Sequence, residues 1–204
     1  MKDETAADTT KASESEYHIN YSTETKRMLL SVLLCNLVQE GNLAKIRDVV
    51  ASVEDLSLIQ DYDFRTPLHI AAVKDRVEIA QFLINRGAKI NSLDRWKRTP
   101  LNEAVANKSK KVAKILAQHQ GSFCLSGMEL AVFLNKIIMT GDLYMLQLAF
   151  LSGASVNCFD YDDRSPLHVS GDLGLKKIWN FLIAKGADMA KKDRWGNFPN
   201  FRPK

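Results

Sequence analysis

The chain has 204 residues, 46% of them hydrophobic, and a formal net charge of +4 at pH 7. This apolar content suits a globular core and excludes a chain that is disordered throughout. The modest net charge leaves only local electrostatic roles. Three widely spaced cysteines, Cys35, Cys124 and Cys158, favour reduced thiols in an intracellular protein.

Residues 1–25 form a polar, acidic first segment without the apolar run that a secretion signal requires. We expect a flexible tail there. The longest apolar run, around Met28 to Leu34, is too short to span a bilayer. The sequence therefore predicts a cytoplasmic protein without a transmembrane segment, with the nucleus as an alternative location.

A spacing of 33 residues organises the remainder of the chain. The positions that recur in register are Asp61, Asp94, Asp160 and Asp193, the motifs that begin at Thr66, Thr99 and Ser165, and the glycines Gly87, Gly153 and Gly186. These anchors predict units at about 26–60, 61–93, 94–126, 127–159 and 160–192, followed by a truncated unit at 193–204. Residues 33–96 also resemble residues 132–195, which indicates a duplicated block of three units.

Each recurring position has a local chemical role. Thr66 and Ser165 can cap a helix by accepting a hydrogen bond from a free backbone N–H, and the proline that follows suits the first helical position. The apolar positions of residues 68–84 have the spacing of two short helices that share a buried face. Gly87 supplies the left-handed residue that ends the second helix. The pattern predicts a helix pair in each unit.

A Thr-Pro-Leu-His motif that opens a helix pair, and a Gly-Ala motif that closes it, at a period of 33 resembles the ankyrin repeat. The resemblance covers about residues 26–200 and implies an all-α ankyrin-repeat solenoid of about five helix-turn-helix repeats with short hairpin-like turns. The strings "DYDDRSPLH" and "DRWG" are similar to the ankyrin tails of animal glutaminases and, more loosely, of plant outward-rectifying potassium channels and some asparaginases. Only the scaffold carries over, because no catalytic or pore segment matches.

Four departures from this pattern stand out. The unit at 127–159 has Val-Phe-Leu-Asn, residues 132–135, in place of Thr-Pro-Leu-His, and Asp75 stands where glycine is usual between the helices. The first unit, at about 26–60, lacks the Thr-Pro signal, and we expect it to cap the stack. At the other end, the last unit stops where another helix is due. Its apolar face is either bare or covered by Phe198, Phe201 and the tail, by a partner, or by a missing segment.

The sequence contains no catalytic motif, and we expect no catalytic residue, no metal site and no cofactor. His69 and His168 recur at one repeat position, where a histidine can bond the capping residue and the next turn. The Asp-Tyr-Asp turns at 61–63 and 160–162 lack the glycine and bidentate glutamate of a calcium loop. Short acidic turns of this kind usually bond their own backbone.

A binding role has stronger support, because the turns of a repeat stack line a long surface. The candidate partner-binding residues are Tyr62, Phe64, Arg65, Trp96, Lys97, Arg98, Tyr161, Arg164, Arg194 and Trp195. Aromatic residues and arginine dominate contact energies between proteins. The alternative is that the tryptophans and tyrosines pack sideways on the next turn and the aspartates fix the loops. Phe64 has no counterpart in the other turns, and contact or accident explains it equally well.

A basic patch, Lys108, Lys110, Lys111 and Lys114, suggests contact with an acidic protein, a lipid headgroup or nucleic acid. A solvated helix face explains the same residues. Nucleic acid is disfavoured, because no recognition element accompanies the charges.

The sequence therefore predicts a non-catalytic scaffold that binds another protein through its turns and concave face. One alternative is a regulatory ankyrin module or fragment related to a glutaminase, an asparaginase or an ion channel. A second is a basic-patch binder of nucleic acid or anionic membrane. Self-association also stays open.

Overall fold

A computed structural model describes residues 22–125 and 127–203 of the chain. This part forms ten α-helices and a short 3-10 helix, without a β-strand. The elements are α1 (Thr23–Glu40), α2 (Leu43–Ala51), η1 (Leu56–Leu58), α3 (Pro67–Val73), α4 (Val77–Asn85), α5 (Pro100–Ala106), α6 (Lys110–Gln118), α7 (Gly127–Met139), α8 (Leu143–Leu151), α9 (Pro166–Asp172) and α10 (Lys176–Ala184). The predicted N-terminal tail lies outside the described residues up to position 21, and α1 begins at Thr23.

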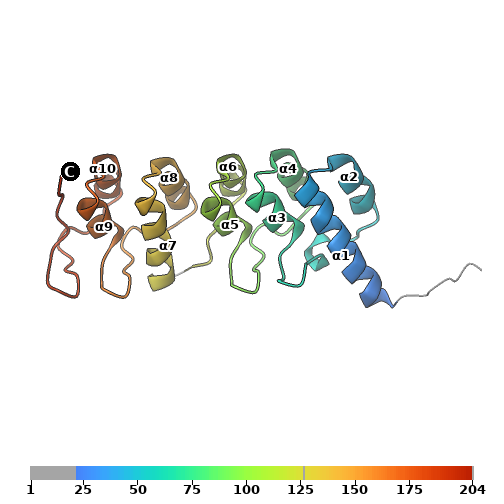
Figure 1. The fold of residues 1–204 in the computed structure, drawn as a ribbon, viewed down its shortest axis with the longest axis horizontal. Coiled ribbons are helices and arrows are strands. Elements are labelled where there is room, and N and C mark those ends of the chain that lie inside the picture. Colours follow the sequence, from blue (N-terminus) through green and yellow to red (C-terminus); the bar gives the residue numbers. More distant parts are fainter. Residues whose placement is uncertain (1–21, 126, 204) are drawn as a thin grey trace, which may run out of the picture.

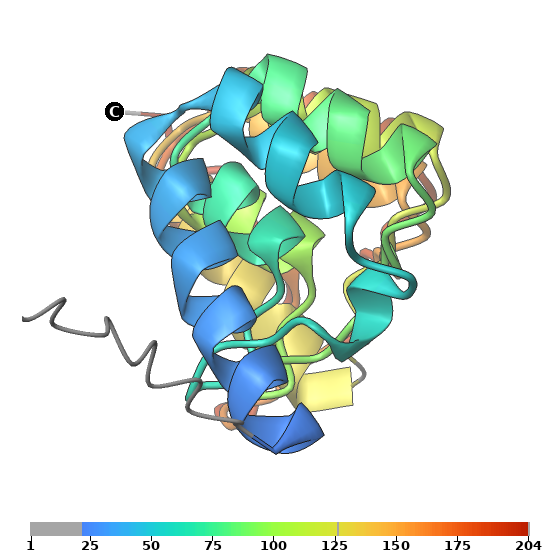
Figure 2. The same cartoon turned by 90° about the vertical axis from the view of Figure 1, so that its right-hand side faces the viewer.

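The helices pair along the chain, α1 with α2 through α9 with α10, and the pairs stand side by side in a row (Figure 1). Seen along the row, the odd-numbered helices form one layer and the even-numbered helices form a second (Figure 2). Turns between the pairs project beyond the odd-numbered helices, on the side away from the even-numbered layer. This is the predicted all-α solenoid.

Helices α3, α5 and α9 begin with the same local chemistry. Thr66, Thr99 and Ser165 are their N-caps, each followed by a proline and each joined to the third helical residue in a capping box. At the other end of the unit, Gly87 has φ 82° and so supplies the left-handed residue that was predicted to end α4. The helix boundaries therefore follow directly from the recurring motifs.

One continuous core runs through the row. The first helix of each unit from the second to the fifth contributes a fully buried leucine at the same position, Leu68, Leu101, Leu134 and Leu167. Full burial of one such side chain contributes about 1.5–3 kcal/mol. Because these leucines belong to one buried cluster that includes residues of all five units, the repeats stabilise one another as a stack.

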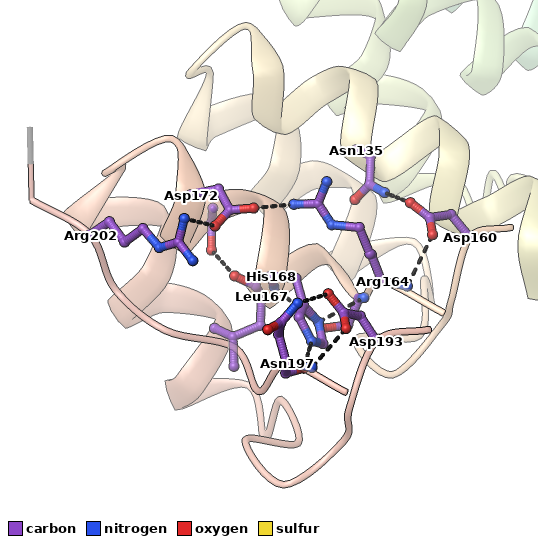
Figure 3. Close-up of polar contacts among 11 residues, drawn as sticks. Asn135, Asp160, Arg164, Leu167, His168, Asp172, Asp193, Asn197 and Arg202 are labelled. Carbon is purple, nitrogen blue, oxygen red and sulfur yellow. Dashed lines mark hydrogen bonds and ion pairs between the residues drawn. The ribbon is translucent and has the colours of Figure 1, made fainter. Parts of the chain in front are cut away.

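The two repeat histidines have the structural role that was predicted. In His69, Nδ1 accepts a hydrogen bond from the Thr66 backbone N–H at 3.0 Å, so Nε2 carries the proton and donates to the Arg98 carbonyl oxygen at 3.0 Å. His168 joins Ser165 to Asn197 in the same way (Figure 3). Each imidazole thus ties a helix start to the next turn. Burial lowers the pKa of His69 below its ordinary value of 6.5.

The C-terminal residues fold back over α9 and cover part of the last unit. The Arg202 backbone N–H donates to the Gly171 carbonyl oxygen at 3.1 Å, and the Arg202 side chain reaches Asp172 (Figure 3). The Phe201 ring lies 5.8 Å from the Trp179 ring, measured between centroids, whereas Phe198 stays exposed. The tail therefore covers part of this face, as one of the alternatives stated, and it does so through Phe201 rather than Phe198.

Gly171 makes this close approach possible. The position 99 residues earlier holds Ala72, but a Cβ at Gly171 would lie only 2.3 Å from the Asn200 carbonyl oxygen. The last unit therefore differs from its counterpart where the tail crosses the helix.

None of the helices in the described residues is sufficiently long and apolar to traverse a bilayer. Within the same part of the chain, no cluster of three or more potential metal-ligating side chains occurs.

Candidate functional site

Four hairpin turns in the described part of the chain have one construction. We name them turn 1 (61–65), turn 2 (94–98), turn 3 (160–164) and turn 4 (193–197). In turn 1, the Asp61 N–H donates a hydrogen bond to the Arg65 carbonyl oxygen at 2.9 Å. The Asp61 Oδ1 atom accepts hydrogen bonds from the backbone N–H groups of Asp63 and Arg65. The leading aspartates of the other turns, Asp94, Asp160 and Asp193, make the same bonds. These aspartates hold the turns, as the alternative for them stated.

The turns are joined in two pairs. In the first pair, the Arg95 N–H donates to the Asp63 carbonyl oxygen at 2.9 Å, and Arg95 Nη1 donates to Asp63 Oδ1 at 3.0 Å. Arg194 makes both bonds to Asp162, at 2.9 and 2.8 Å, and this hydrogen bonding raises the pKa of Arg194 above its ordinary value. Turn 1 is thereby fixed to turn 2, and turn 3 to turn 4.

The aromatic side chains of the turns lie outside the core. Tyr62 is 87% exposed, Trp96 54%, Tyr161 78% and Trp195 63%. The Arg95 guanidinium lies 5.4 Å from the centroid of Tyr62 and 5.8 Å from that of Trp96. Such cation–π contacts orient a ring without burying it. Tyr62 and Trp96 therefore share one arginine, which is a limited form of the sideways packing that the alternative described.

Phe64 occupies a strained position at the tip of turn 1. Its φ is 58°, in the left-handed region, and its side chain is 56% exposed. The same position holds Lys97, Asp163 and Gly196 in the other turns. A left-handed conformation costs a non-glycine residue about 1–2 kcal/mol. Little burial offsets this cost at Phe64.

Three predicted arginines are engaged inside their own units. Arg65 pairs with Asp61 at 2.8 Å, Arg98 pairs with Glu103 at 3.1 Å, and Arg164 pairs with Asp172. The pair of Arg65 lies within turn 1, whereas the pairs of Arg98 and Arg164 brace a turn against the helix that follows. The guanidinium groups are consequently less available to a partner than the exposed rings of Tyr62 and Trp96.

The structure divides the predicted basic patch into two parts. Lys110, Lys111 and Lys114 are exposed on α6, beside Tyr144 of α8, in the even-numbered layer. Lys110 Nζ lies 2.8 Å from Asp142 Oδ2, so one of these charges is already paired. Lys108 instead follows α5 and lies on the side of the odd-numbered helices, near Trp96. The four lysines therefore do not form one surface.

A recess lies between turns 2 and 3, where the unit at 127–159 has no turn. The unit at 127–159 begins directly with α7, which extends into the row of turns (Figure 1). The close packing of α1 with α3, α3 with α5 and α7 with α9 is not repeated between α5 and α7. A cavity of about 440 Å³ results, lined by Trp96 of turn 2 on one side and Tyr161 of turn 3 on the other.

Sequence reasoning missed this recess and the linking role of Arg95. The sequence marks only the unusual unit: Gly127 stands where the other units have aspartate, and residues 132–135 lack the Thr-Pro-Leu-His motif. In this unit, Asn135 takes the histidine position, and its Nδ2 donates to Asp160 Oδ2 at 3.1 Å (Figure 3). The amide thus keeps the link to the next turn that histidine provides elsewhere.

The helix pairs, capping boxes and hairpin turns are those of the ankyrin-repeat fold. The family model described as Ankyrin repeats (3 copies) matches residues 34–126. The solved structure of the ankyrin repeat protein EF0377 superposes with a TM-score of 0.65 at 21% identity, covering 81% of this chain and 87% of that one. The chain therefore carries ankyrin repeats and has the ankyrin-repeat fold.

Curated relatives are much longer proteins. The chain is 34% identical over 189 residues to Potassium channel KOR2 of Oryza sativa subsp. japonica, which covers 93% of this chain and 26% of the channel. It is 26% identical over 185 residues to L-asparaginase of Dirofilaria immitis, covering 89% of this chain and 31% of that protein. It is 36% identical over 88 residues to the mitochondrial liver isoform of glutaminase from Mus musculus, covering 42% of this chain and 14% of that protein.

The chain thus spans between about a seventh and a third of these relatives. Ankyrin repeats are generally protein–protein interaction modules, and their fold is typically non-catalytic. The similarity to enzymes and channels concerns this scaffold.

Proposed function

We propose that the chain is a non-catalytic module that binds another protein through turns 1–4 and the face formed by its odd-numbered helices. The observation that carries this proposal is the exposure of four turn aromatics, Tyr62, Trp96, Tyr161 and Trp195, on a braced framework. Large exposed aromatics that the core does not need are typical anchors of protein interfaces.

The bracing of the turns supports the same role. Arg95 and Arg194 hold neighbouring turns together before any partner arrives, so little conformational entropy is lost when a partner binds. Phe64 adds a further exposed ring. The left-handed backbone at this position suits glycine or a polar residue better than phenylalanine. Lys97 adds a positive charge next to Trp96 in turn 2.

We place this activity in the cytoplasm, with the nucleus as the alternative. The three cysteines are free, and Cys35 and Cys158 are buried. Burial raises the pKa of Cys35 to about 12 and that of Cys158 to about 11, which keeps both as unreactive thiols. Reduced structural thiols fit an intracellular compartment.

Affinity capture from native extract with the full chain as bait tests the proposal. Tyr62→Ala and Trp96→Ala should each reduce capture of a specific partner by about tenfold or more, since a hot-spot residue contributes on the order of 2 kcal/mol. Tyr144→Ala, on the even-numbered layer, is the matched control and should capture normally. Unfolding of the turn variants in urea at much lower midpoints, with capture otherwise unchanged, contradicts the proposal.

A second candidate is a regulatory module of a larger enzyme or channel. The relatives favour it, since most of this chain aligns with a fraction of a potassium channel and of an asparaginase. Reading the coding sequence on either side of this chain tests whether such a domain accompanies it. Assays of the isolated chain for glutaminase and asparaginase activity should give background rates, and activity above background would overturn the non-catalytic assignment.

A further inference from the structure

The recess between α5 and α7 combines an apolar floor with an aromatic rim. Val105 of α5, Leu125, and Val132, Phe133 and Ile137 of α7 form its apolar lining. Trp96 and Tyr161 flank it from turns 2 and 3. At about 440 Å³, it falls within the size range of sites that enclose a ligand group, roughly 300–1,000 Å³.

Among the side chains that line the recess, the amide oxygen of Asn102 and the hydroxyl of Thr140 are already engaged in hydrogen bonds. Asn102 Oδ1 accepts from Thr99 Oγ1 at 2.6 Å, and Thr140 Oγ1 donates to the Ile137 carbonyl oxygen at 2.7 Å. A small polar ligand needs a few free polar groups that fix its orientation. The floor therefore favours an apolar group, held by shape and by burial.

Charges around the recess are mainly positive. Arg98, Lys108 and Lys136 line it, against one acidic side chain, Glu129. Arg98 is neutralised by Glu103, but among the described residues neither Lys108 nor Lys136 forms an ion pair. Two exposed ammonium groups beside an apolar floor complement an apolar side chain that has acidic neighbours.

We propose that this recess receives an apolar side chain from a segment of the partner protein, with acidic residues of that segment on either side of it. The proposal rests on the protein-binding function and assigns its specificity to the place where one turn is missing. Continuity with Trp96 and Tyr161 favours a protein segment over a free small molecule, because both rings border the recess and the face that the turns line.

The test begins with selection from a phage-displayed library of random dodecapeptides on the immobilised full chain. Enriched peptides should share a leucine, methionine or phenylalanine with at least two Asp or Glu residues close to it in sequence. The most enriched peptide is then synthesised with a fluorescein label, and its affinity for each variant is measured by fluorescence anisotropy. A derivative with its acidic residues changed to Lys should bind about tenfold more weakly.

Two pairs of variants isolate the recess. Ala106→Trp fills the recess from the end of α5 and should weaken peptide binding about tenfold or more, whereas Ala51→Trp, at the exposed end of α2, should not. Lys136→Glu should weaken binding by about three- to tenfold, whereas Lys114→Glu, with the same charge change on α6, should alter it less than about twofold. Because Lys136 is exposed, its variant keeps the test decisive if Ala106→Trp fails to fold.

Enrichment of basic peptides would overturn the proposal. So would equal peptide binding by Ala106→Trp and Ala51→Trp together with equal binding by Lys136→Glu and Lys114→Glu. Dimerisation of the wild type in sedimentation analysis that Ala106→Trp abolishes would also overturn it, by making a second copy the occupant. The same variants distinguish a failure of the recess assignment from a failure of the protein-binding function. If Ala106→Trp captures the native partner normally while Trp96→Ala does not, only the recess assignment is wrong.

Discussion

Arg95 donates two hydrogen bonds to Asp63, one from its backbone N–H at 2.9 Å and one from Nη1 at 3.0 Å, and so fixes turn 2 against turn 1. The pair recurs 99 residues later as Arg194 and Asp162. Between the two braced pairs lies the unit without a turn. The surface of the molecule is thus two rigid pairs of aromatic turns that flank a recess.

Asp63→Ala should loosen turn 1 from turn 2 with little loss of stability, because it removes the bond from Arg95 Nη1 and leaves the backbone bond in place. The ion pair is partly exposed, so its removal should lower the free energy of unfolding by less than about 1 kcal/mol. Partner binding should fall further, because Arg95 no longer holds Tyr62 and Trp96 in one arrangement. Urea unfolding and affinity capture measure the two effects. Asp162→Ala is the matched change in the second pair, and a loss of several kcal/mol in either variant would mean that the turns carry the fold.

Phe64→Gly should raise the stability of the fold and weaken partner binding. Glycine relieves the left-handed strain, so the free energy of unfolding should rise by up to about 1 kcal/mol after the entropic cost of glycine is subtracted. Binding should weaken, because an exposed ring is lost. Asp163→Gly relieves the same backbone geometry in turn 3 without removing a ring. A Phe64→Gly chain that binds its partner as well as the wild type would assign Phe64 to accident.

His69→Asn should remove a pH dependence of stability. The folded-state pKa of His69 lies below the unfolded value of about 6.5, so the unfolded chain binds the proton more readily. The stability that the neutral ring contributes is complete above pH 6.5 and is lost as the pH falls toward the folded-state pKa. Asn102 fills the same position in the next unit and keeps the capping box, so the variant should fold.

The measurement for this prediction is urea unfolding of both proteins between pH 7.5 and 5.5. The variant should be less stable at pH 7.5 by about 1 kcal/mol, since the bond to the Arg98 carbonyl oxygen is lost. That difference should shrink as the pH falls. A difference that stays constant over this range would show that protonation of His69 is not coupled to unfolding.

Gly171→Ala should displace the C-terminal tail. The added Cβ would meet the Asn200 carbonyl oxygen at 2.3 Å and a Trp179 ring carbon at 2.7 Å, which requires the tail to move. We expect a loss of about 1–3 kcal/mol in the free energy of unfolding, measured in urea. In a chain shortened after Asn197, the same substitution should cost less, because the Trp179 ring, no longer packed by Phe201, can shift away from the new Cβ. An equal loss in both chains would place the strain at Trp179 of α10 rather than under the tail.

Much of the fold could be predicted from the sequence because each recurring anchor acts locally. Thr66 and Ser165 cap the residues just after them, and Gly87 ends the helix just before it, so a period of 33 in these anchors specifies the helix pairs. The exposure of Tyr62 and Trp96 was predicted only as one of two outcomes. Whether a turn aromatic packs sideways depends on the neighbouring unit, which lies 33 residues away in sequence.

The recess could not be predicted, because it arises from an absence and from packing. The missing motif at residues 132–135 was visible in the sequence, but it does not reveal that α7 leaves a gap against α5. The same holds for the basic patch. Lys108 and Lys110 are two residues apart in sequence, yet the end of α5 and the start of α6 direct them to different layers.

Site-specific photocrosslinking tests most directly whether the turns contact the partner. A benzoylphenylalanine placed at position 96 in turn 2 should form a crosslinked product with the partner on irradiation in native extract. The same group at position 144, on the even-numbered layer, should give little product. Crosslinking from position 144 that equals or exceeds that from position 96 would contradict the account, because the partner would then bind the layer opposite the turns.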